Sequence, residues 1–390
     1  MAKLLNQGAY GCVYYPGFTC KGNLEREKKF ATKIEIYDKT SKNELDISKT
    51  VRSIKNYSKF FSPVLKHCVT KLKKIEKFKN SLDECEAVNV SENLYNEFIL
   101  IYINYINGKE IEKYILSIET PGIYITKILK DYVFLQENIK KLQAKNIIHY
   151  DLHVGNILHD IDRNTPIIID FGLSINSLKF YTDDKKIDYL QIKKSTMHYS
   201  PKHYTYPPEL HFITYILSNI DRDNVERKIN EKISRESIKA FIDDLTDANK
   251  VYKRYYYYKK LHNNTTDKTD TKLENNVIDN YRKELEKYYN KYANKTIKYI
   301  VDDLIDHIYY LDMYTLTIDY TIISIKILDK LIVEQGSNNK TVITLLFFIV
   351  ELLINNLKVE PNMRMSLKEY RTLYNILFKR EIRVPVHFCW

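Results

Sequence analysis

Two stretches decide the fold class: HYDLHVGNIL, residues 149–158, and IIIDFG, residues 167–172. Their apolar runs are typical of buried strands, and the polar turn between them contains Asn and Pro. The resulting hairpin carries three oxygen-bearing side chains: Asp151, Asn156 and Asp170. Because two short buried strands form a rigid support, this arrangement predicts a metal site.

Phosphoryl transfer is the chemistry that suits such a support, since it needs positioning and charge neutralisation above all. Mg²⁺ prefers oxygen ligands and keeps several waters and phosphate oxygens, so one carboxylate and one amide suffice as protein ligands. A second carboxylate can orient the attacking hydroxyl and accept its proton. A chance hairpin is the alternative, and two spaced motifs in one order argue against it.

The order of these residues resembles the protein-kinase signature His-x-Asp-Leu-x-x-x-x-Asn followed by Asp-Phe-Gly. The resemblance implies ATP and Mg²⁺ as cofactors. It makes Asp151 the catalytic base, assigns Mg²⁺ to Asn156 and Asp170, and has Phe171 pack internally behind Asp170.

Near the N-terminus, LNQGAYGCVY (residues 5–14) predicts two strands joined by a glycine-containing turn. Glycines let backbone N–H groups approach phosphate oxygens without obstruction by a Cβ atom. An ordinary hairpin is the alternative. The stretch resembles the kinase Gly-rich loop, with Asn6 in place of the first glycine. The resemblance implies nucleotide contacts from Leu5, Asn6, Gly8, Gly11 and Val13.

Residues 30–34, FATKI, predict a strand that resembles the kinase Val-Ala-Ile-Lys strand. By that resemblance Lys33 contacts the nucleotide phosphates, and it needs an anchoring carboxylate. Apolar spacing predicts a helix over residues 41–57 with Ser41 as N-cap. Glu44 in its first turns is the expected partner of Lys33, and a surface glutamate is the alternative.

The following segments predict the remainder of a small β-rich lobe. We expect a strand at 61–69, a solvated loop or hairpin at 71–92, and a buried strand at 97–103. The segment after this strand resembles a kinase hinge, which places the lobe boundary near residue 106. The resemblance implies nucleotide contacts from Ala31, Ile103, Asn104 and Ile106. An amphipathic helix over 121–145 then leads to the catalytic stretch.

Downstream, Tyr206-Pro207-Pro208-Glu209 resembles the Ala-Pro-Glu that ends a kinase activation segment. The resemblance predicts a buried arginine partner for Glu209, and Pro361-Asn362-Met363-Arg364 supplies one. An unpaired buried charge is costly, so the two residues should occur as a pair. Asp312 resembles the aspartate that holds the catalytic-loop backbone. Its distance from Glu209 predicts a mostly helical insertion at about 213–308.

Within this insertion, residues 252–260 (YKRYYYYKK) interleave cations with aromatic rings. Such a stretch can stack on bases and pair with phosphates, which makes nucleic acid an alternative partner. The favoured interpretation is a helix whose tyrosines pack inward while its lysines face water.

The amino-acid composition gives expectations about charge, disulfides and the cellular compartment of the protein. The 390 residues include 61 Lys and Arg against 50 Asp and Glu, a net charge of +11, and the charge is spread along the chain. Five cysteines lack paired C-x-x-C spacing, which argues against disulfides and structural zinc and favours a reducing, intracellular setting. No signal peptide or membrane span is expected, and the apolar run 342–354 predicts a core helix.

Taken together, the motifs resemble those of the eukaryotic-type protein kinases. A weaker resemblance is to the divergent kinases encoded by large DNA viruses. The implied fold is α+β and bilobal, with a small β-rich N-lobe (1–106) and a large helical C-lobe (107–390). Three departures stand out: Tyr150 replaces an arginine, His153 replaces a lysine near the transferring phosphate, and Lys202 stands where a threonine is common. His153 is a third candidate catalytic residue beside Asp151 and Lys33.

The implied activity is transfer of the γ-phosphate of ATP to Ser or Thr of a protein substrate by a monomer. Two alternatives stay open. The first is a small-molecule phosphotransferase, because Asp-Leu-His-x-x-Asn also resembles enzymes of the aminoglycoside and choline kinase type. The second is a non-catalytic module that binds a nucleotide.

Overall fold

The computed structural model describes residues 2–8, 11–26, 29–86, 96–196, 198–248, 257–260, 262, 271–335 and 340–380. The chain divides into two compact units. Unit 1 comprises Met1–Ile111 and Lys141–Asn176, and unit 2 comprises Glu112–Lys140 and Ser177–Trp390. Helices and sheets are both present, as the expected α+β class requires. The bilobal arrangement and the boundary near residue 106 stay predictions.

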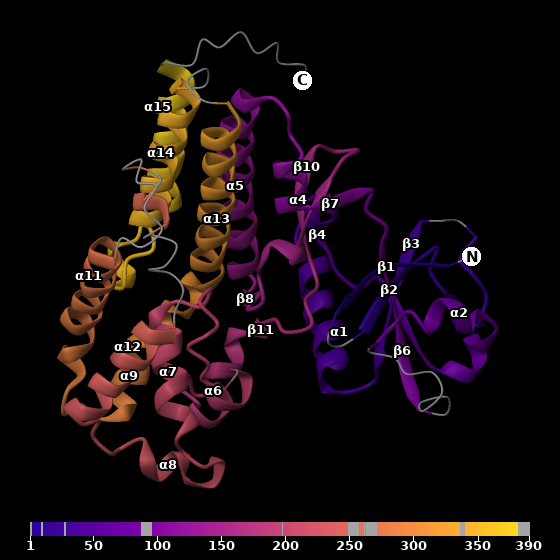
Figure 1. Cartoon of the computed structure of the whole chain (residues 1–390). Coiled ribbons are helices and arrows are strands. Elements are labelled where there is room, and N and C mark those ends of the chain that lie inside the picture. Colours follow the sequence, from indigo (N-terminus) through magenta and orange to yellow (C-terminus); the bar gives the residue numbers. More distant parts are fainter. Residues whose placement is uncertain are drawn as a thin grey trace. The chain divides into compact units, whose positions relative to one another are not determined.

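Unit 1 is built on a five-stranded antiparallel sheet with the order β1-β2-β3-β6-β5 (Figure 1). Alternate side chains of these strands are buried on opposite faces, as the period of two requires. One face packs Tyr14, Ile34 and Leu100 into a core, and the other packs Ile99 and Ile101. The strands are β1 (Lys3–Gly8), β2 (Gly11–Tyr15), β3 (Phe30–Ile36), β5 (Lys66–Lys71) and β6 (Glu97–Asn104).

Helix α1 (Lys39–Arg52) follows β3 and confirms the predicted helix, with a different cap and an end at Arg52 instead of residue 57. The N-cap is Asp38, whose Oδ1 accepts the backbone N–H groups of Thr40 and Ser41 at 2.8 and 3.0 Å. Ser41 occupies the third helical position, and its hydroxyl accepts the Asp38 N–H at 3.0 Å. The prediction of Ser41 as N-cap is therefore wrong, because the capping box begins three residues earlier.

The segment after α1 differs from the expected single strand at 61–69. Two strands form there, β4 (Phe61–Ser62) and β5, and Pro63 follows the first of them. Strand β4 pairs with β10 and β5 pairs with β6, so the two belong to different sheets. A proline cannot donate to a strand ladder, which accounts for the break.

The Lys-rich segment after β5 packs into the core, which corrects the predicted solvated loop over its described part. A 3-10 helix, η2 (Leu72–Phe78), and helix α2 (Lys79–Leu82) occupy it. Leu72, Ile75 and Leu82 are fully buried in the same cluster as Tyr14. The buried apolar side chains, and not the lysines between them, determine the packing. Residues 87–95 lie outside the described part of the chain.

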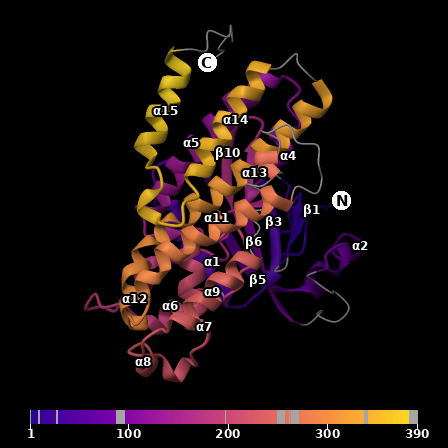
Figure 2. The same cartoon turned by 60° about the vertical axis from the view of Figure 1, so that its left-hand side comes forward.

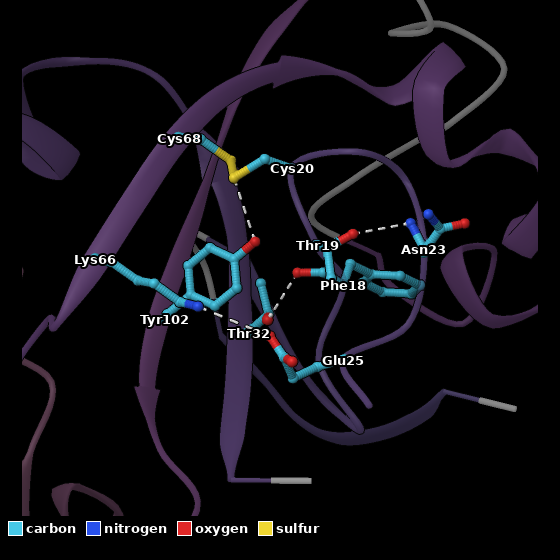
Figure 3. Close-up of a disulfide and its surroundings, with 9 residues drawn as sticks. All are labelled: Phe18, Thr19, Cys20, Asn23, Glu25, Thr32, Lys66, Cys68 and Tyr102. Atoms are coloured by element: carbon cyan, nitrogen blue, oxygen red, sulfur yellow. Dashed lines mark hydrogen bonds and ion pairs between the residues drawn. A yellow bond between two sulfur atoms is a disulfide. The ribbon is translucent and has the colours of Figure 1, made fainter. Parts of the chain in front are cut away.

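Two disulfides cross-link unit 1, and the prediction that the cysteines form none is wrong. Cys12 of β2 is bonded to Cys85, and Cys20 to Cys68 of β5. In Figure 3 the ring of Tyr102 lies beside the second bond, and its hydroxyl donates to Sγ of Cys20 at 3.3 Å. The argument for a reducing compartment rested on free cysteines, so it loses its support.

Residues 149–172, which carry the candidate site residues Asp151, Asn156 and Asp170, lie in the smaller sheets of unit 1. Strands β9 (Ile157–Asp160) and β10 (Thr165–Ile169) form the predicted antiparallel hairpin, within a four-stranded sheet β4-β10-β9-β7. Strand β7 is Gly108–Glu110, and β8 (Ile147–Ile148) pairs with β11 (Ile175–Asn176). These pairings hold the loop before β9 and the turn after β10.

Unit 2 is helical in its described residues. Helices α13 (Leu311–Gln335) and α14 (Lys340–Asn355) lie side by side in both views (Figures 1 and 2). Tyr132 of α5 (Pro121–Gln143) shares a 2.7 Å hydrogen bond with Thr317 of α13. The other helices are α4 (Ile111–Leu116), α6 (Tyr189–Ser195), α7 (Pro208–Ser218), α8 (Val225–Lys228), α9 (Arg235–Ala248), α11 (Thr271–Tyr289), α12 (Ile297–Ile305) and α15 (Leu367–Arg380).

Three predictions for unit 2 can be compared with the structure. The predicted helical character of 213–308 is confirmed for its described residues. The apolar run 342–354 lies in α14 with Leu346, Ile349 and Leu353 buried. No helix among the described residues has the length and apolar character needed to cross a bilayer. Residues 252–256 of the Tyr/Lys stretch lie outside the described part.

The predicted pair of Glu209 and Arg364 is confirmed. The two guanidinium nitrogens Nη1 and Nη2 of Arg364 lie 2.6 and 2.8 Å from the two carboxylate oxygens of Glu209. The side chains are 4% and 1% exposed for Arg364 and Glu209. This is a buried bidentate ion pair, the geometry in which each charge depends on the other.

Candidate active site

Lys33 lies on β3 with its ammonium group against three carboxylates of unit 1. Its Nζ is 2.9 Å from Oε2 of Glu44, 2.9 Å from Oε2 of Glu35 and 3.4 Å from Oδ1 of Asp170. Burial alone would lower the pKa of Lys33, but Glu44, Asp170 and Glu35 outweigh it and hold the pKa well above its usual value. The lysine is therefore a permanent positive charge in a fixed position.

Glu44 reaches Lys33 from α1, on the buried face of that helix. It is 4% exposed, and burial raises its pKa to about 7 although Lys33 opposes this. Asn43 beside it donates its amide Nδ2–H to the backbone oxygens of Ser174 and Gly172 at 2.8 and 3.2 Å. These bonds tie α1 to the segment after Asp170. The sequence paired Glu44 with Lys33 but gave no signal for Asn43.

Asp170 follows the end of β10 with a left-handed backbone, at φ +59°. Burial favours a higher pKa for Asp170, but Lys33 and the Gly172 N–H outweigh it, so the pKa lies below its usual value. Phe171 is fully buried against Phe61, as predicted, with ring centroids 6.2 Å apart. The Asp170 carboxylate is thus ionised and 42% exposed, and the buried Phe171 next to it anchors the turn.

His149 links the loop that carries Asp151 and Asn156 to the turn that carries Asp170. Its ring Nε2–H donates to the backbone oxygen of Ile169 at 3.0 Å, and its own backbone oxygen accepts from Ser174 Oγ at 3.1 Å. The ring also lies 5.2 Å from that of Phe171, centroid to centroid. Because Ile169 precedes Asp170, these bonds fix the loop before β9 against the turn after β10.

Asp151 and Asn156 lie together in the loop between β8 and β9. The Asn156 amide Nδ2–H donates to the backbone oxygen of Asp151 at 2.8 Å and to its Oδ2 at 3.3 Å. Burial raises the pKa of the Asp151 carboxyl, partly offset by His153 and His149. Tyr150, just before it, is buried at φ +70°. A bulky residue with this backbone is uncommon outside constrained sites.

His153 caps the short 3-10 helix η3 (Val154–Asn156). Its Nδ1 accepts the Gly155 N–H at 3.1 Å, and its Nε2 lies 3.9 Å from Oδ2 of Asp151. The ring is 48% exposed. The geometry therefore gives His153 a role in shaping the loop, and its catalytic role stays a prediction.

The glycine-containing hairpin β1–β2 flanks Lys33. Gly8 pairs with Gly11, and Val13 pairs with Lys33 in the sheet register. A Cβ atom at Gly11 would lie 2.2 Å from the Ile34 oxygen, so only glycine fits there, whereas Gly8 has open space. Leu5 is 45% exposed in β1. Ala9 and Tyr10 of the turn itself lie outside the described residues.

Asn6 of β1 uses its side chain locally, since its Oδ1 accepts the Gln7 N–H at 2.9 Å. A bulge interrupts the strand between Leu4 and Asn6. The replacement of the first glycine by asparagine is thus accommodated by the hairpin's own backbone.

The residues expected around adenine lie on adjacent strands. Ala31 of β3 is buried and pairs with Ile103 of β6. Asn104 ends β6, and Ile106 lies in the connection to β7. Tyr105 between them stacks on Tyr15, with ring centroids 3.7 Å apart, a contact that the sequence did not predict. Their contacts to a nucleotide stay predictions.

The donor set fits a hard divalent cation such as Mg²⁺. Asp170 supplies an ionised carboxylate, and Asn156 turns its Nδ2 toward Asp151, which leaves its amide oxygen as the atom for a ligand. No cluster of three or more His, Cys, Asp or Glu suited to a metal occurs among the described residues. A cation here would therefore rely on phosphate oxygens and water for its remaining ligands.

A strand lysine paired with a helix glutamate, beside Asp-Phe-Gly and an Asp/Asn loop, defines a kinase-like site. Residues 70–200 match the family model described as ABC1 atypical kinase-like domain. The chain is 25% identical over 168 residues to the probable serine/threonine-protein kinase fnkB of Dictyostelium discoideum, covering 40% of this chain and 31% of fnkB. It is also 26% identical over 129 residues to the EKC/KEOPS complex subunit bud32 of the same organism, covering 33% of this chain and 48% of bud32.

These matches support a kinase-like protein. They span less than half of either relative, so the activities and partners of the whole relatives do not transfer directly. The weak resemblance to kinases of large DNA viruses stays a prediction.

Proposed function

We propose that the protein is an ATP- and Mg²⁺-dependent protein kinase that transfers the γ-phosphoryl group to Ser or Thr hydroxyls. One observation carries this proposal. A buried Lys33–Glu44 ion pair lies against Asp170, and His149 links the Asp170 turn to the loop that holds Asp151 and Asn156. Phosphoryl transfer needs this combination of a fixed cation, metal-binding oxygens and a proton acceptor.

Lys33 would neutralise nucleotide phosphates. Its pKa is held high, so it stays an ammonium group throughout the physiological range. The backbone N–H groups of the β1–β2 hairpin would contribute further donors, because Gly8 leaves open space above the strand. The Lys33 ammonium group and the backbone N–H groups of the hairpin would thus position the phosphates.

Asp151 would orient the acceptor hydroxyl and accept its proton. Burial raises the pKa of its carboxyl, which makes the carboxylate a better proton acceptor, and 39% of the side chain is exposed to an incoming substrate. Asn156 fixes its orientation through the bonds to its backbone oxygen and Oδ2.

Asp170 and Asn156 would hold Mg²⁺. Asp170 stays ionised because Lys33 and Gly172 lower its pKa. Bound Mg²⁺ supplies charge neutralisation on the β- and γ-phosphate oxygens.

A protein acceptor is favoured over a small molecule by the buried pair of Glu209 and Arg364. This pair braces the end of the segment that resembles a kinase activation segment. The name of fnkB as a probable serine/threonine-protein kinase adds support. A small-molecule acceptor is the second candidate, favoured by His153, which lies 3.9 Å from Asp151 in an Asp-Leu-His-x-x-Asn loop.

The test is transfer of radiolabelled phosphate from ATP, with Mg²⁺, to a peptide library and to a panel of small hydroxyl compounds. Asp151→Asn and Asp170→Asn should each abolish transfer, while the exposed Asp183→Asn serves as the matched control. Labelling of peptides that only the two site variants lose supports the proposal. Labelling of small molecules alone would favour the second candidate. Full activity in both site variants refutes the assignment, and tight ATP binding with no transfer identifies a binding module.

A further inference from the structure

Glu35 is a third carboxylate on Lys33, beside Glu44 and Asp170, and the kinase resemblance does not account for it. It lies two residues after Lys33 on β3, so both side chains project from the same face of the strand. Its Oε2 is 2.9 Å from Lys33 Nζ, the same distance as that to Glu44. The kinase motifs include Glu44 and Asp170, whereas Glu35 lies outside these motifs.

The environment of Glu35 makes a solvated-surface role untenable. The residue is 2% exposed, and its second oxygen, Oε1, is buried and makes no hydrogen bond to any described residue. Gly11 lies opposite it in the sheet, where an added Cβ would come within 2.8 Å of the Glu35 Cβ. Burying a carboxylate is costly unless a cation compensates it, and Lys33 is the compensating cation.

The two nearer carboxylates, Glu44 and Glu35, belong to different elements, and Asp170 lies farther from Lys33 Nζ, at 3.4 Å. Glu44 reaches it from α1, so this contact depends on where the helix lies. Glu35 shares the strand of Lys33, so its contact is kept wherever the helix lies. A lysine held from its own strand is therefore expected to stay oriented even when the bond to Glu44 lengthens.

We propose that Glu35 is a positioning residue that acts on phosphoryl transfer through Lys33, as a second anchor that partly substitutes for Glu44. The inference rests on the proposed function, because it assigns Lys33 to the nucleotide phosphates. Two other roles make different predictions. If Glu35 competed with the phosphates for Lys33, its removal would raise activity. If Glu35 were purely structural, its removal would affect folding alone.

The experiment is a double-mutant cycle with Glu35→Gln and Glu44→Gln, in which glutamine keeps the shape and removes the charge. Each single variant should lower kcat/KM for ATP by about tenfold, and the double variant by about a thousandfold, beyond the product of the single effects. The excess arises because either acid alone still orients the lysine. Glu35→Asp should recover part of the loss, and Glu97→Gln on the neighbouring strand β6 should be neutral.

Three results overturn the inference: an equal effect of Glu35→Gln with and without Glu44, a gain of activity, or a loss that follows the melting temperature alone. ATP affinity, measured by calorimetry on the same variants, gives a reading independent of turnover. Should the wild type bind ATP without transferring phosphate, the proposed function fails, while the cycle in ATP affinity still decides the role of Glu35. Should the wild type bind no ATP, both are refuted.

Discussion

The ion pair of Glu209 and Arg364 gives the sharpest stability prediction. Both side chains are almost completely buried, and two nitrogen–oxygen contacts of 2.6 and 2.8 Å join them. Arg364 also donates its Nε–H to the Lys358 backbone oxygen at 2.9 Å, and its guanidinium lies 4.7 Å from the ring centroid of Tyr314. The arginine thus connects α7, the segment before α15 and α13.

Replacing Arg364 by methionine leaves the Glu209 carboxylate buried without its cation. Breaking a buried pair in this way costs about 3–5 kcal/mol. For a unit of this size about 1 kcal/mol corresponds to roughly 2–4 °C, so the melting temperature should fall by about 6–20 °C. The double variant Glu209→Met/Arg364→Met leaves neither charge and should recover most of the loss.

Thermal and urea unfolding of the wild type, both single variants and the double variant provide the measurement. Arg371→Met is the matched control, because Arg371 pairs with Glu137 at 2.6 Å with both side chains partly exposed. The control should lose less than about 1 kcal/mol. A loss equally small for Arg364→Met, or a double variant as unstable as the sum of its single changes, would refute the reasoning.

Two further predictions concern unfolding. Replacing Cys20 and Cys68 by serine opens a loop that spans 48 residues and should destabilise unit 1 by about 4 kcal/mol, with Cys389→Ser as the control and thermal unfolding without reductant as the measurement. Burial lowers the pKa of His211 to about 4, and its Nε2–H donates to the His203 backbone oxygen at 3.2 Å. The pKa of His211 is higher in the unfolded chain, so burying the neutral imidazole makes the free energy of unfolding depend on pH. That free energy keeps its full value above about pH 6.5 and falls by about 3 kcal/mol toward pH 4. His211→Gln should remove that part of the acid sensitivity in urea unfolding, and an identical pH dependence of the variant would contradict it.

Local patterns in the sequence predicted the elements that carry the site. The stretch FATKI around Lys33 predicted β3, the helical spacing after it placed Glu44 on α1, and the two apolar runs predicted the β9–β10 hairpin. These signals span a few residues each, and the physical rules behind them are local. The fixed order of the kinase motifs then linked the segments.

What sequence reasoning missed depends on contacts between distant segments. Cys12 and Cys85 are 73 residues apart, and no spacing rule pairs cysteines at that distance. Asn43 gains its role only because the segment after Asp170 folds back onto α1. The segment 71–86 looked solvated because its lysines outnumber the apolar side chains that the core receives.

Some misses had a signal that a closer reading would have used. Glu35 directly follows the predicted strand 30–34 and stands two residues after Lys33, so a strand longer by one residue would place both side chains on one face. Pro63 lies inside the expected strand 61–69, where it marks a break. Asp38 precedes Ser41 by three residues, the spacing of a capping box.

The disulfides are nested in sequence, with the bond between Cys20 and Cys68 inside that between Cys12 and Cys85. Both Lys33 and Glu44 lie within the inner ring. A protease that cut one peptide bond between residues 21 and 67 would therefore leave two fragments joined by sulfur at two points. Such a nicked chain would run as one species on a gel until a thiol was added, and its lysine strand would not be released.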